Sequence, residues 1–192
     1  MNMHKEDKRI VKTKKLIKRT IIELMREKEV QNITVTDIAE KAEINRGTFY
    51  MHYQDIYSLA DEIENDILGG ITEILENASK LLVNESTEKP LLLIKLLECF
   101  YHNRDSAEIF LGGKGYISFQ LKLKYILING LYEIIRLNIV KTTDPSGFGV
   151  IFIATGLIGI IQEWVQSGFK KSPEEIAQIF MDIKGHYVRG WQ

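Results

Sequence analysis

A short stretch near the N-terminus concentrates side chains that are suited to nucleic acid. Residues 45–53 read NRGTFYMHY and supply a guanidinium, a hydroxyl, an imidazole and phenols. Such groups bind phosphate oxygens and the edges of bases in a DNA groove. If the stretch is a helix, Phe49 and Tyr53 share a face that packs inward, because they lie four residues apart. The residues left on the outward face are Arg46, Gly47, Thr48, Tyr50 and His52.

These residues need a supporting helix and a tight connection before them. Thr34 or Thr36 can cap a helix that begins near residue 36. On this helix the small Ala39 lets a following helix cross close against it. After a connection at residues 43–44, Asn45 can cap the second helix. A short helix, a tight connection and a polar-faced helix are the outline of a DNA-reading helix-turn-helix.

An amphipathic helix on each side completes this module. Residues 8–28 place an apolar stripe on one helix face. Residues 55–66 hold five acids and no Lys or Arg, with apolar residues at helical spacing, and should form a fourth helix that links two parts of the chain. We therefore predict a helix-turn-helix DNA-binding domain at 1–54 and an effector-binding and dimerisation domain at 55–192.

The rest of the chain also indicates helices. No strand-like alternation, hairpin dipeptide or internal repeat is present, so the predicted fold is all-α with about nine helices. The three prolines, Pro90, Pro145 and Pro173, each lie where a helix could begin. Ser172 and Glu175 have the spacing of a capping box, which places the start of the last helix there.

The charge distribution favours DNA contact at the N-terminus. The 192 residues carry a net charge of −1, but residues 1–20 hold eight Lys/Arg against two Asp/Glu, which gives +6 there and −7 in the rest. A basic arm or helix face beside the helix-turn-helix would neutralise phosphates and release counterions. The alternative is a solvated helix face. The residues concerned are Lys5, Lys8, Arg9, Lys12, Lys14, Lys15, Lys18 and Arg19.

Composition excludes several other classes of protein. A content of 45% hydrophobic and 27% charged residues is ordinary for a soluble globular protein. The single cysteine, Cys99, cannot form an internal disulfide, and no secretory leader is recognisable, so we expect the cytoplasm. The longest apolar run, at 147–161, is short against the roughly 20 residues of a membrane span. We interpret it as a core helix and expect no membrane association.

No constellation of residues supports catalysis. The four histidines, at positions 4, 52, 102 and 186, show no paired metal spacing. Cys99 and His102 lie three apart, but they lack further ligands, and packing is the preferred interpretation. We therefore expect no enzyme activity, no metal and no cofactor.

Residues 34–53 resemble the TetR family of transcriptional regulators, whose signature there reads roughly T-V-x-D-I-A-x-x-A-G-V-s-x-G-T-F/L-Y-x-H/Y-F. The matching positions are Thr34, Val35, Asp37, Ile38, Ala39, Ala42, Ile44 for valine, Gly47, Thr48, Phe49, Tyr50, His52, and Tyr53 for phenylalanine. The resemblance implies that Arg46, Thr48 and Tyr50 contact base edges and nearby phosphates. It also implies phosphate contacts for His52 and Tyr53 and a backbone contact for Thr36.

Two departures from the family pattern affect stability and affinity. Glu43 stands where the family usually has glycine, which costs ~1 kcal/mol if the turn needs a left-handed residue. Ile56 and Gln54 stand where the family often has lysines, so contact with the DNA backbone should be weaker than is typical.

The C-terminal pattern is similar to one subgroup of the same family. Residues 156–168 read GLIGIIQEWVQSG and precede Ser172-Pro-Glu-Glu. This subgroup resembles regulators of dihydroxyacetone-kinase operons, some of which act through protein partners. TetR-like proteins dimerise through their last two long helices, and both helices here carry apolar stripes. The alternative is that the stripes only fill the core of one chain.

The predicted function is that of a homodimeric repressor on a pseudo-palindromic operator, released by a small-molecule effector. The alternative is a TetR-fold coregulator that acts mainly through a protein partner. Aromatic residues in the middle of the chain, at positions 68–145, could form the walls of a pocket for an apolar or aromatic effector. For any single one of them, packing in the core is the preferred interpretation. These are Phe100, Tyr101, His102, Phe110, Tyr116, Phe119 and Tyr125.

Overall fold

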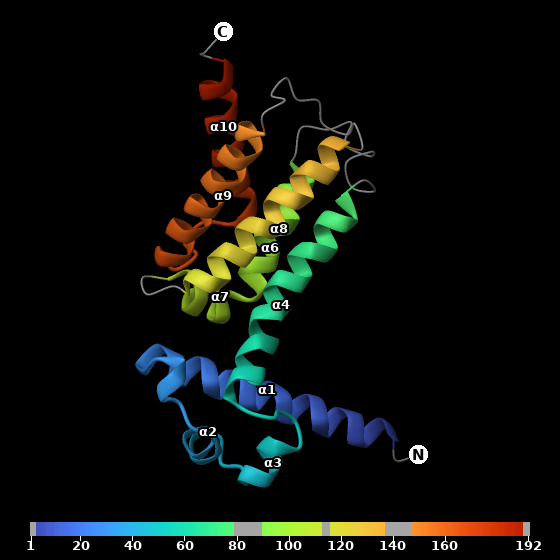
Figure 1. Cartoon of the computed structure of the whole chain (residues 1–192), viewed down its shortest axis with the longest axis vertical. Helices are drawn as coiled ribbons and strands as arrows, with labels where there is room; N and C mark the ends of the chain where they lie inside the picture. Colours follow the sequence, from blue (N-terminus) through green and yellow to red (C-terminus); the bar gives the residue numbers. More distant parts are fainter. Residues whose placement is uncertain (1–2, 79–89, 113–115, 137–146, 190–192) are drawn as a thin grey trace. The chain divides into compact units, whose positions relative to one another are not determined.

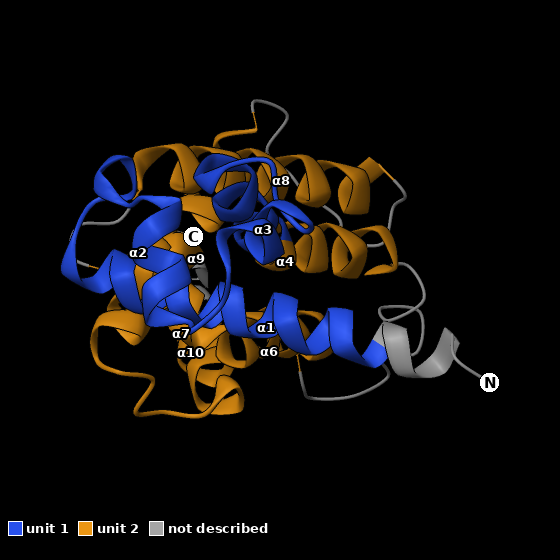
Figure 2. Cartoon of the chain, turned by 90° about the horizontal axis from the view of Figure 1, so that it is seen from below, with its two compact units in different colours: residues 1–65 blue, residues 66–192 orange. Residues whose placement is uncertain are grey.

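The computed structural model describes residues 3–78, 90–112, 116–136 and 147–189, with side chains between positions 8 and 183. In these ranges the chain forms nine α-helices, one 3-10 helix and no strand (Figure 1). This confirms the predicted all-α fold. The chain divides into two compact units, Met1–Asn65 and Asp66–Gln192 (Figure 2). The division lies inside helix α4, and a boundary after residue 54 stays a prediction.

The first unit is a small helical module around the helix-turn-helix. It contains α1 (Met3–Glu27), a 3-10 helix (Val30–Asn32), α2 (Val35–Lys41), α3 (Arg46–Tyr50) and the first part of α4 (Ile56–Glu76). Helix α2 packs against both α1 and α3. The fully buried side chains at the centre of the module are Ile17, Ile21, Ile38, Phe49 and Leu59. The predicted helices on both sides of the motif are therefore present.

The turn between α2 and α3 requires a left-handed residue. Glu43 has a φ of 52°, one of two positive-φ residues other than glycine among those described. Its backbone N–H donates to the carbonyl of Glu40, and the N–H of Ile44 donates to that of Ala39, at 3.2 and 2.9 Å. This is a Schellman motif, whose left-handed position is usually glycine. Glu43 therefore occupies a conformation that strains a residue with a Cβ.

The second unit is a bundle built from the end of α4 and five further helices. These are α6 (Leu91–His102), α7 (Arg104–Leu111), α8 (Ile117–Arg136), α9 (Phe148–Gln166) and α10 (Pro173–Arg189). Helices α7 and α8 pack on α9, whereas α10 packs mainly on α6. A Cβ at Gly130 of α8 would lie 2.7 Å from a methyl carbon of Leu75, so glycine lets α8 approach the end of α4.

The predicted helix starts are confirmed where the structure describes them. Pro90 immediately precedes α6, and α10 begins at Pro173. The capping box is present, since the N–H of Ser172 donates to Glu175 at 2.7 Å and the N–H of Glu175 donates to the Ser172 hydroxyl oxygen at 3.3 Å. The start predicted at Pro145 lies outside the described residues.

Helix α9 has one covered face and one exposed face. Ala154, Ile161 and Val165 are buried against the rest of the unit. On the other face Phe148 and Phe152 are 73% and 69% exposed in the single chain. By length and composition α9 is the one helix of the described part that could cross a membrane, and 39% of that segment is buried inside the protein.

Three of the aromatic residues at positions 100–125 are packed inside the second unit. Phe100, Phe110 and Phe119 are at most 1% exposed, and the rings of Phe110 and Phe119 stack 5.0 Å apart. Tyr101 stacks on Trp164 at 6.1 Å, whereas Tyr125 is 70% exposed. The packing interpretation is therefore confirmed for the three phenylalanines, because neighbouring side chains surround their rings.

The strained turn leads to a prediction about stability. Glu43→Gly should raise the free energy of unfolding by about 1 kcal/mol, because glycine adopts a positive φ without strain. The control is Glu40→Gly, an exposed position inside α2, which should lower it by about the same amount. Chemical denaturation of the three proteins measures both changes. A Glu43→Gly protein less stable than wild type would contradict the strain.

Candidate nucleic-acid interface

The first helix of the motif starts at a well-formed cap. The N–H of Thr34 donates to the Asp37 carboxylate at 2.7 Å, and the N–H of Asp37 donates to the Thr34 hydroxyl oxygen at 3.1 Å. The cap is therefore Thr34, one of the two predicted residues, and the helix begins at Val35. Lys28 lies 2.8 Å from Asp37, and its hydrogen bond, followed by those from Thr34, lowers the Asp37 pKa to about 2.

The second helix is capped by Asn45, as the sequence predicted. The Asn45 side chain accepts a hydrogen bond of 2.8 Å from the N–H of Gly47. Below this helix Phe49 is fully buried and Tyr53 is 5% exposed, with their rings 5.8 Å apart. The inward face predicted from their spacing is confirmed. It fixes which side chains of α3 face away from the module.

The predicted contact residues differ in their exposure. Arg46, Gly47 and Tyr50 are exposed, and Tyr50 is 58% exposed with its ring edge-on to Phe49. Thr36, Thr48 and His52 are half-buried. Met51, which sequence reasoning missed, is 78% exposed. The surface thus offers a guanidinium, a phenol, a thioether and a glycine backbone to a ligand.

Tyr53 has a different environment from the other predicted contacts. Its hydroxyl donates a hydrogen bond of 3.2 Å to Glu62 on α4. The ammonium group of Lys14 lies 5.2 Å from the centre of its ring, within the range of a cation–π contact. Tyr53 therefore connects the end of the recognition helix to α1 and α4.

Glu62 is the centre of an ion-pair network that sequence reasoning missed. Its carboxylate lies 2.8 Å from the ammonium of Lys14 and 2.9 Å from that of Lys18. Partial burial raises the Glu62 pKa, but hydrogen bonds from Lys14 and Lys18 outweigh it and lower the pKa from 4.5 to about 2. Such a network could have been predicted from the sequence, because the acid-rich segment 55–66 follows a helix rich in Lys and Arg.

The basic residues of α1 fall into two groups. Lys14 and Lys18 point toward Glu62, so the expectation that all eight cations form one DNA-facing group needs correction. Lys12, Lys15 and Arg19 line a hollow on the surface of α1 and are exposed. The side chain of Lys5 lies outside the described residues. This exposed group lies outside the Glu62 network, and within it Arg19 lies 3.7 Å from Glu23.

The described residues offer no group suited to a metal ion. Among them, no three His, Cys, Asp or Glu side chains lie together in such an arrangement. The Cys99 thiol is half-buried and lies 3.7 Å from the carbonyl oxygen of Ile67. Burial raises its pKa, which favours the unreactive protonated thiol.

Two family models cover most of the chain. Residues 17–63 match the bacterial regulatory proteins of the tetR family, and residues 90–184 match a transcriptional regulator C-terminal region. The chain belongs to the TetR family of bacterial DNA-binding transcriptional regulators. The resemblance stated from the sequence is thus confirmed. The TetR fold and family are those of transcriptional regulators, which are not enzymes.

Several individual proteins are similar to this chain. The uncharacterized HTH-type transcriptional regulator YxbF of Bacillus subtilis is 32% identical over 62 residues, which are 32% of this chain and only 16% of that protein. A TetR regulator from Streptococcus agalactiae is 25% identical over 95% of this chain and 98% of its own, with a TM-score of 0.62. The dihydroxyacetone kinase operon activator DhaS shares the fold, at 22% identity over 89% and 93% of the chains and a TM-score of 0.50.

The Glu62 network leads to a prediction that depends on pH. Glu62→Gln should lower the free energy of unfolding by about 1 kcal/mol at neutral pH, a value reduced for the partial exposure of the carboxylate. Because folding depresses the Glu62 pKa, the stabilisation is complete above about pH 4.5. It is lost as the pH falls from 4.5 toward about 2. Chemical denaturation across this range measures the difference.

The control for this prediction is Asp61→Asn, an exposed neighbour on the same helix. It should change stability by less than about 0.5 kcal/mol, as surface substitutions usually do. If Glu62→Gln and Asp61→Asn had equal effects at every pH, the network would contribute nothing specific.

Proposed function

We propose that this TetR-family chain is a homodimeric repressor that reads a pseudo-palindromic operator with α3. The observation that carries the proposal is the outward presentation of Arg46, Gly47 and Tyr50 on a capped helix whose opposite face is buried. In a helix-turn-helix dimer the two recognition helices enter successive turns of the major groove. Repression then follows from occupation of the operator. We place the protein in the cytoplasm with the DNA.

Each residue of the interface has a proposed role. Arg46, Thr48 and Tyr50 contact base edges and nearby phosphates, and His52 contacts a phosphate. Thr36 contacts the DNA backbone from the first turn of α2. Gly47 lets the helix approach the DNA closely, since a glycine has no side chain. The exposed cations of α1, namely Lys12, Lys15 and Arg19, neutralise phosphates.

Tyr53 supports the interface in this proposal and does not touch the DNA. The phosphate contact implied by the family resemblance would require a side chain that is 5% exposed and already bonded to Glu62. We assign it instead to holding the end of the recognition helix. Direct reading by α3 is favoured over a partner-dependent coregulator, because the exposed polar side chains of α3 suit DNA.

Dimerisation is proposed through the last two helices. The exposed face of α9 carries Phe148 and Phe152, and a Cβ at Gly156 or Gly159 would meet open space. Large apolar side chains exposed along one face mark interaction sites, and a two-fold axis lets the same face pair with itself. The exposed apolar residues of α10, which would extend this face, are Ile179, Met181 and Ile183.

The two predicted domains have separate roles in this proposal, and control by the effector belongs to the C-terminal one. We propose that residues 1–54 read DNA and that residues 55–192 bind a small apolar effector and dimerise. Helix α4 belongs to both units, and it is a continuous helix from Ile56 to Glu76. An effector that favours a different position of α4 would change the separation of the two recognition helices and release the DNA.

Reading of the operator can be separated from attraction to phosphate. Arg46→Ala and Tyr50→Ala should each lose about 1–3 kcal/mol of binding to the selected operator and relax its sequence specificity. Lys12→Ala and Lys15→Ala should weaken binding to every sequence, with the salt slope reduced by about one each. Selection from random DNA, followed by fluorescence anisotropy over a range of salt concentrations, measures both effects.

One outcome would count against direct reading, and another against the roles of Arg46 and Tyr50. One is a folded dimer that enriches no palindrome from random or genomic DNA. The other is a palindrome that is enriched equally by wild type and by the Arg46→Ala, Tyr50→Ala double variant. The first result would favour the coregulator alternative, whereas the second would show that other residues read the operator.

The dimer interface has a matched test on two exposed apolar positions. Phe152→Lys on α9 should shift the protein toward monomer and weaken operator binding at least tenfold, because two charges would meet near the two-fold axis. Leu121→Lys on α8, where the wild-type residue is 63% exposed, should leave the dimer intact. Sedimentation equilibrium measures the association. A dimeric Phe152→Lys protein would contradict the proposed interface.

A further inference from the structure

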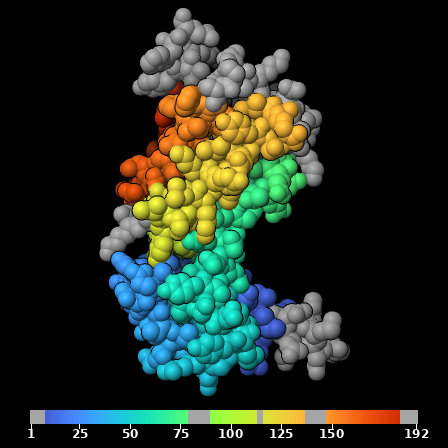
Figure 3. Space-filling view, in the orientation of Figure 1, coloured from blue at the N-terminus to red at the C-terminus, as the bar shows by residue number. Residues whose placement is uncertain are grey.

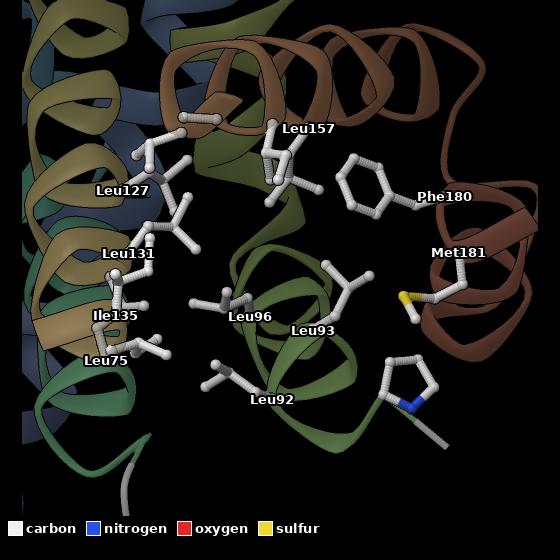
Figure 4. Close-up of a pocket in the computed structure, with 15 residues that line it drawn as sticks. Leu75, Leu92, Leu93, Leu96, Leu127, Leu131, Ile135, Leu157, Phe180 and Met181 are labelled. Atoms are coloured by element: carbon white, nitrogen blue, oxygen red, sulfur yellow. The ribbon is translucent and has the colours of Figure 1, made fainter. Parts of the chain in front are cut away.

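The second unit contains a cavity of about 280 Å³ that DNA reading does not use (Figure 4). Fifteen residues from α4, α6, α8, α9, α10 and Pro90 line it, and every one has an apolar side chain. Phe180 is the one aromatic residue of this lining. The aromatic residues that the sequence suggested as pocket walls are absent from it. The cavity is therefore aliphatic.

We propose that this cavity binds the uncharged aliphatic chain of a small ligand. The inference rests on the proposed function, in which the second unit holds the effector, and it names the chemical class of that effector. Leu92 and Leu96 of α6 point toward the side of Leu131 and Ile135 of α8, and Leu93 of α6 points toward Phe180 of α10 (Figure 4). Branched aliphatic side chains on both sides make a wall that suits methylene groups.

The lining excludes charge and unmatched polar groups from the buried part of the ligand. A hydroxyl or amide placed among these side chains loses its water and gains no hydrogen-bond partner from them. An ionised carboxylate or ammonium group is excluded more strongly, because its desolvation is larger. Each methylene group that enters instead gains the free energy of leaving water. The ligand must therefore present one apolar end.

The composition of the lining favours a chain over a ring system. Ligand sites commonly span about 300–1,000 Å³, so this cavity of about 280 Å³ suits a small ligand. An aromatic ligand gains additional attraction from edge or stacked contacts with other rings, and Phe180 is the one ring in the lining that could supply them. Met181, which is flexible and polarisable, can adapt to a chain beside it.

The cavity also touches the helices to which the proposed function gives effector control and dimerisation. Leu75 lies near the end of α4, and Leu157 lies on the inner side of α9. Phe180 and Met181 reach the space from α10 (Figure 4). A bound chain would thus contact the helix shared by both units and both helices of the proposed dimer interface.

The test compares matched probes on the full-length protein without DNA. Isothermal titration calorimetry with n-octanol should show one molecule bound per chain. The diol of the same length, with a hydroxyl at each end, should bind roughly tenfold to a hundredfold more weakly, because one hydroxyl must be buried without a partner. Octanoate at neutral pH and naphthol should also bind more weakly than n-octanol. Equal affinity for n-octanol and the diol, or tighter binding of naphthol, would overturn the proposal.

A variant that fills the cavity locates the binding site. Ala154 is fully buried and lines the cavity, so Ala154→Met should weaken n-octanol binding roughly tenfold or more. Ser118→Met adds the same side chain at an exposed position of α8 and should bind n-octanol like wild type. Unchanged binding to a folded Ala154→Met protein would overturn the assignment to this cavity. The probe comparison on wild type stands even if the Ala154→Met protein does not fold.

The proposed ligand class and the proposed regulatory role are tested by different measurements. Calorimetry without DNA tests the class alone, whereas release of the selected operator by n-octanol, followed by fluorescence anisotropy, tests regulation. Binding with the predicted order of probes supports the inference whether or not the operator is released. Binding without release would overturn effector control in the proposed function. Absence of n-octanol binding would overturn the inference and leave operator reading intact.

Discussion

The recognition surface depends on the burial of one aromatic face. Helix α3 has five residues, and an isolated helix of that length is not stable in water. Phe49 and Tyr53 hold it against the module beneath, while Asn45 caps its first turn. Arg46 and Tyr50 face outward because the opposite face of the helix is buried in the core. The positions of the side chains that we propose to read DNA are thus a consequence of packing.

Helix α4 connects this packing to the rest of the chain. Near its N-terminal end Glu62 accepts a hydrogen bond from Tyr53 and pairs with Lys14 and Lys18. Near its C-terminal end Leu75 lines the aliphatic cavity and contacts α8 closely at Gly130. The backbone hydrogen bonds of one uninterrupted helix run between these ends. Under the proposed function this continuity is the physical route from the ligand to the DNA.

Helix α9 has two faces that differ in burial. Ala154 and Leu157 are buried and line the cavity, whereas Phe148 and Phe152 are exposed. Figure 3 shows α8 in yellow and α9 in orange on one face of the second unit. Its glycines cost helix propensity, roughly 1 kcal/mol each against alanine. Open space around Gly156 and Gly159 is what a second backbone approaching closely would require.

The all-α fold and the helix caps could be predicted from the sequence, because each depends on residues only a few positions apart. Asn45 and Ser172 were predicted caps, whereas the structure was needed to choose Thr34 over Thr36 and to show the positive φ at Glu43. The partners of residues far apart in the sequence came from the structure alone, because they depend on how the helices pack. The Lys14–Glu62 pair spans 48 positions. Likewise, the cavity is aliphatic because helices far apart in sequence turn their leucines toward the same space, while the phenylalanines pack elsewhere.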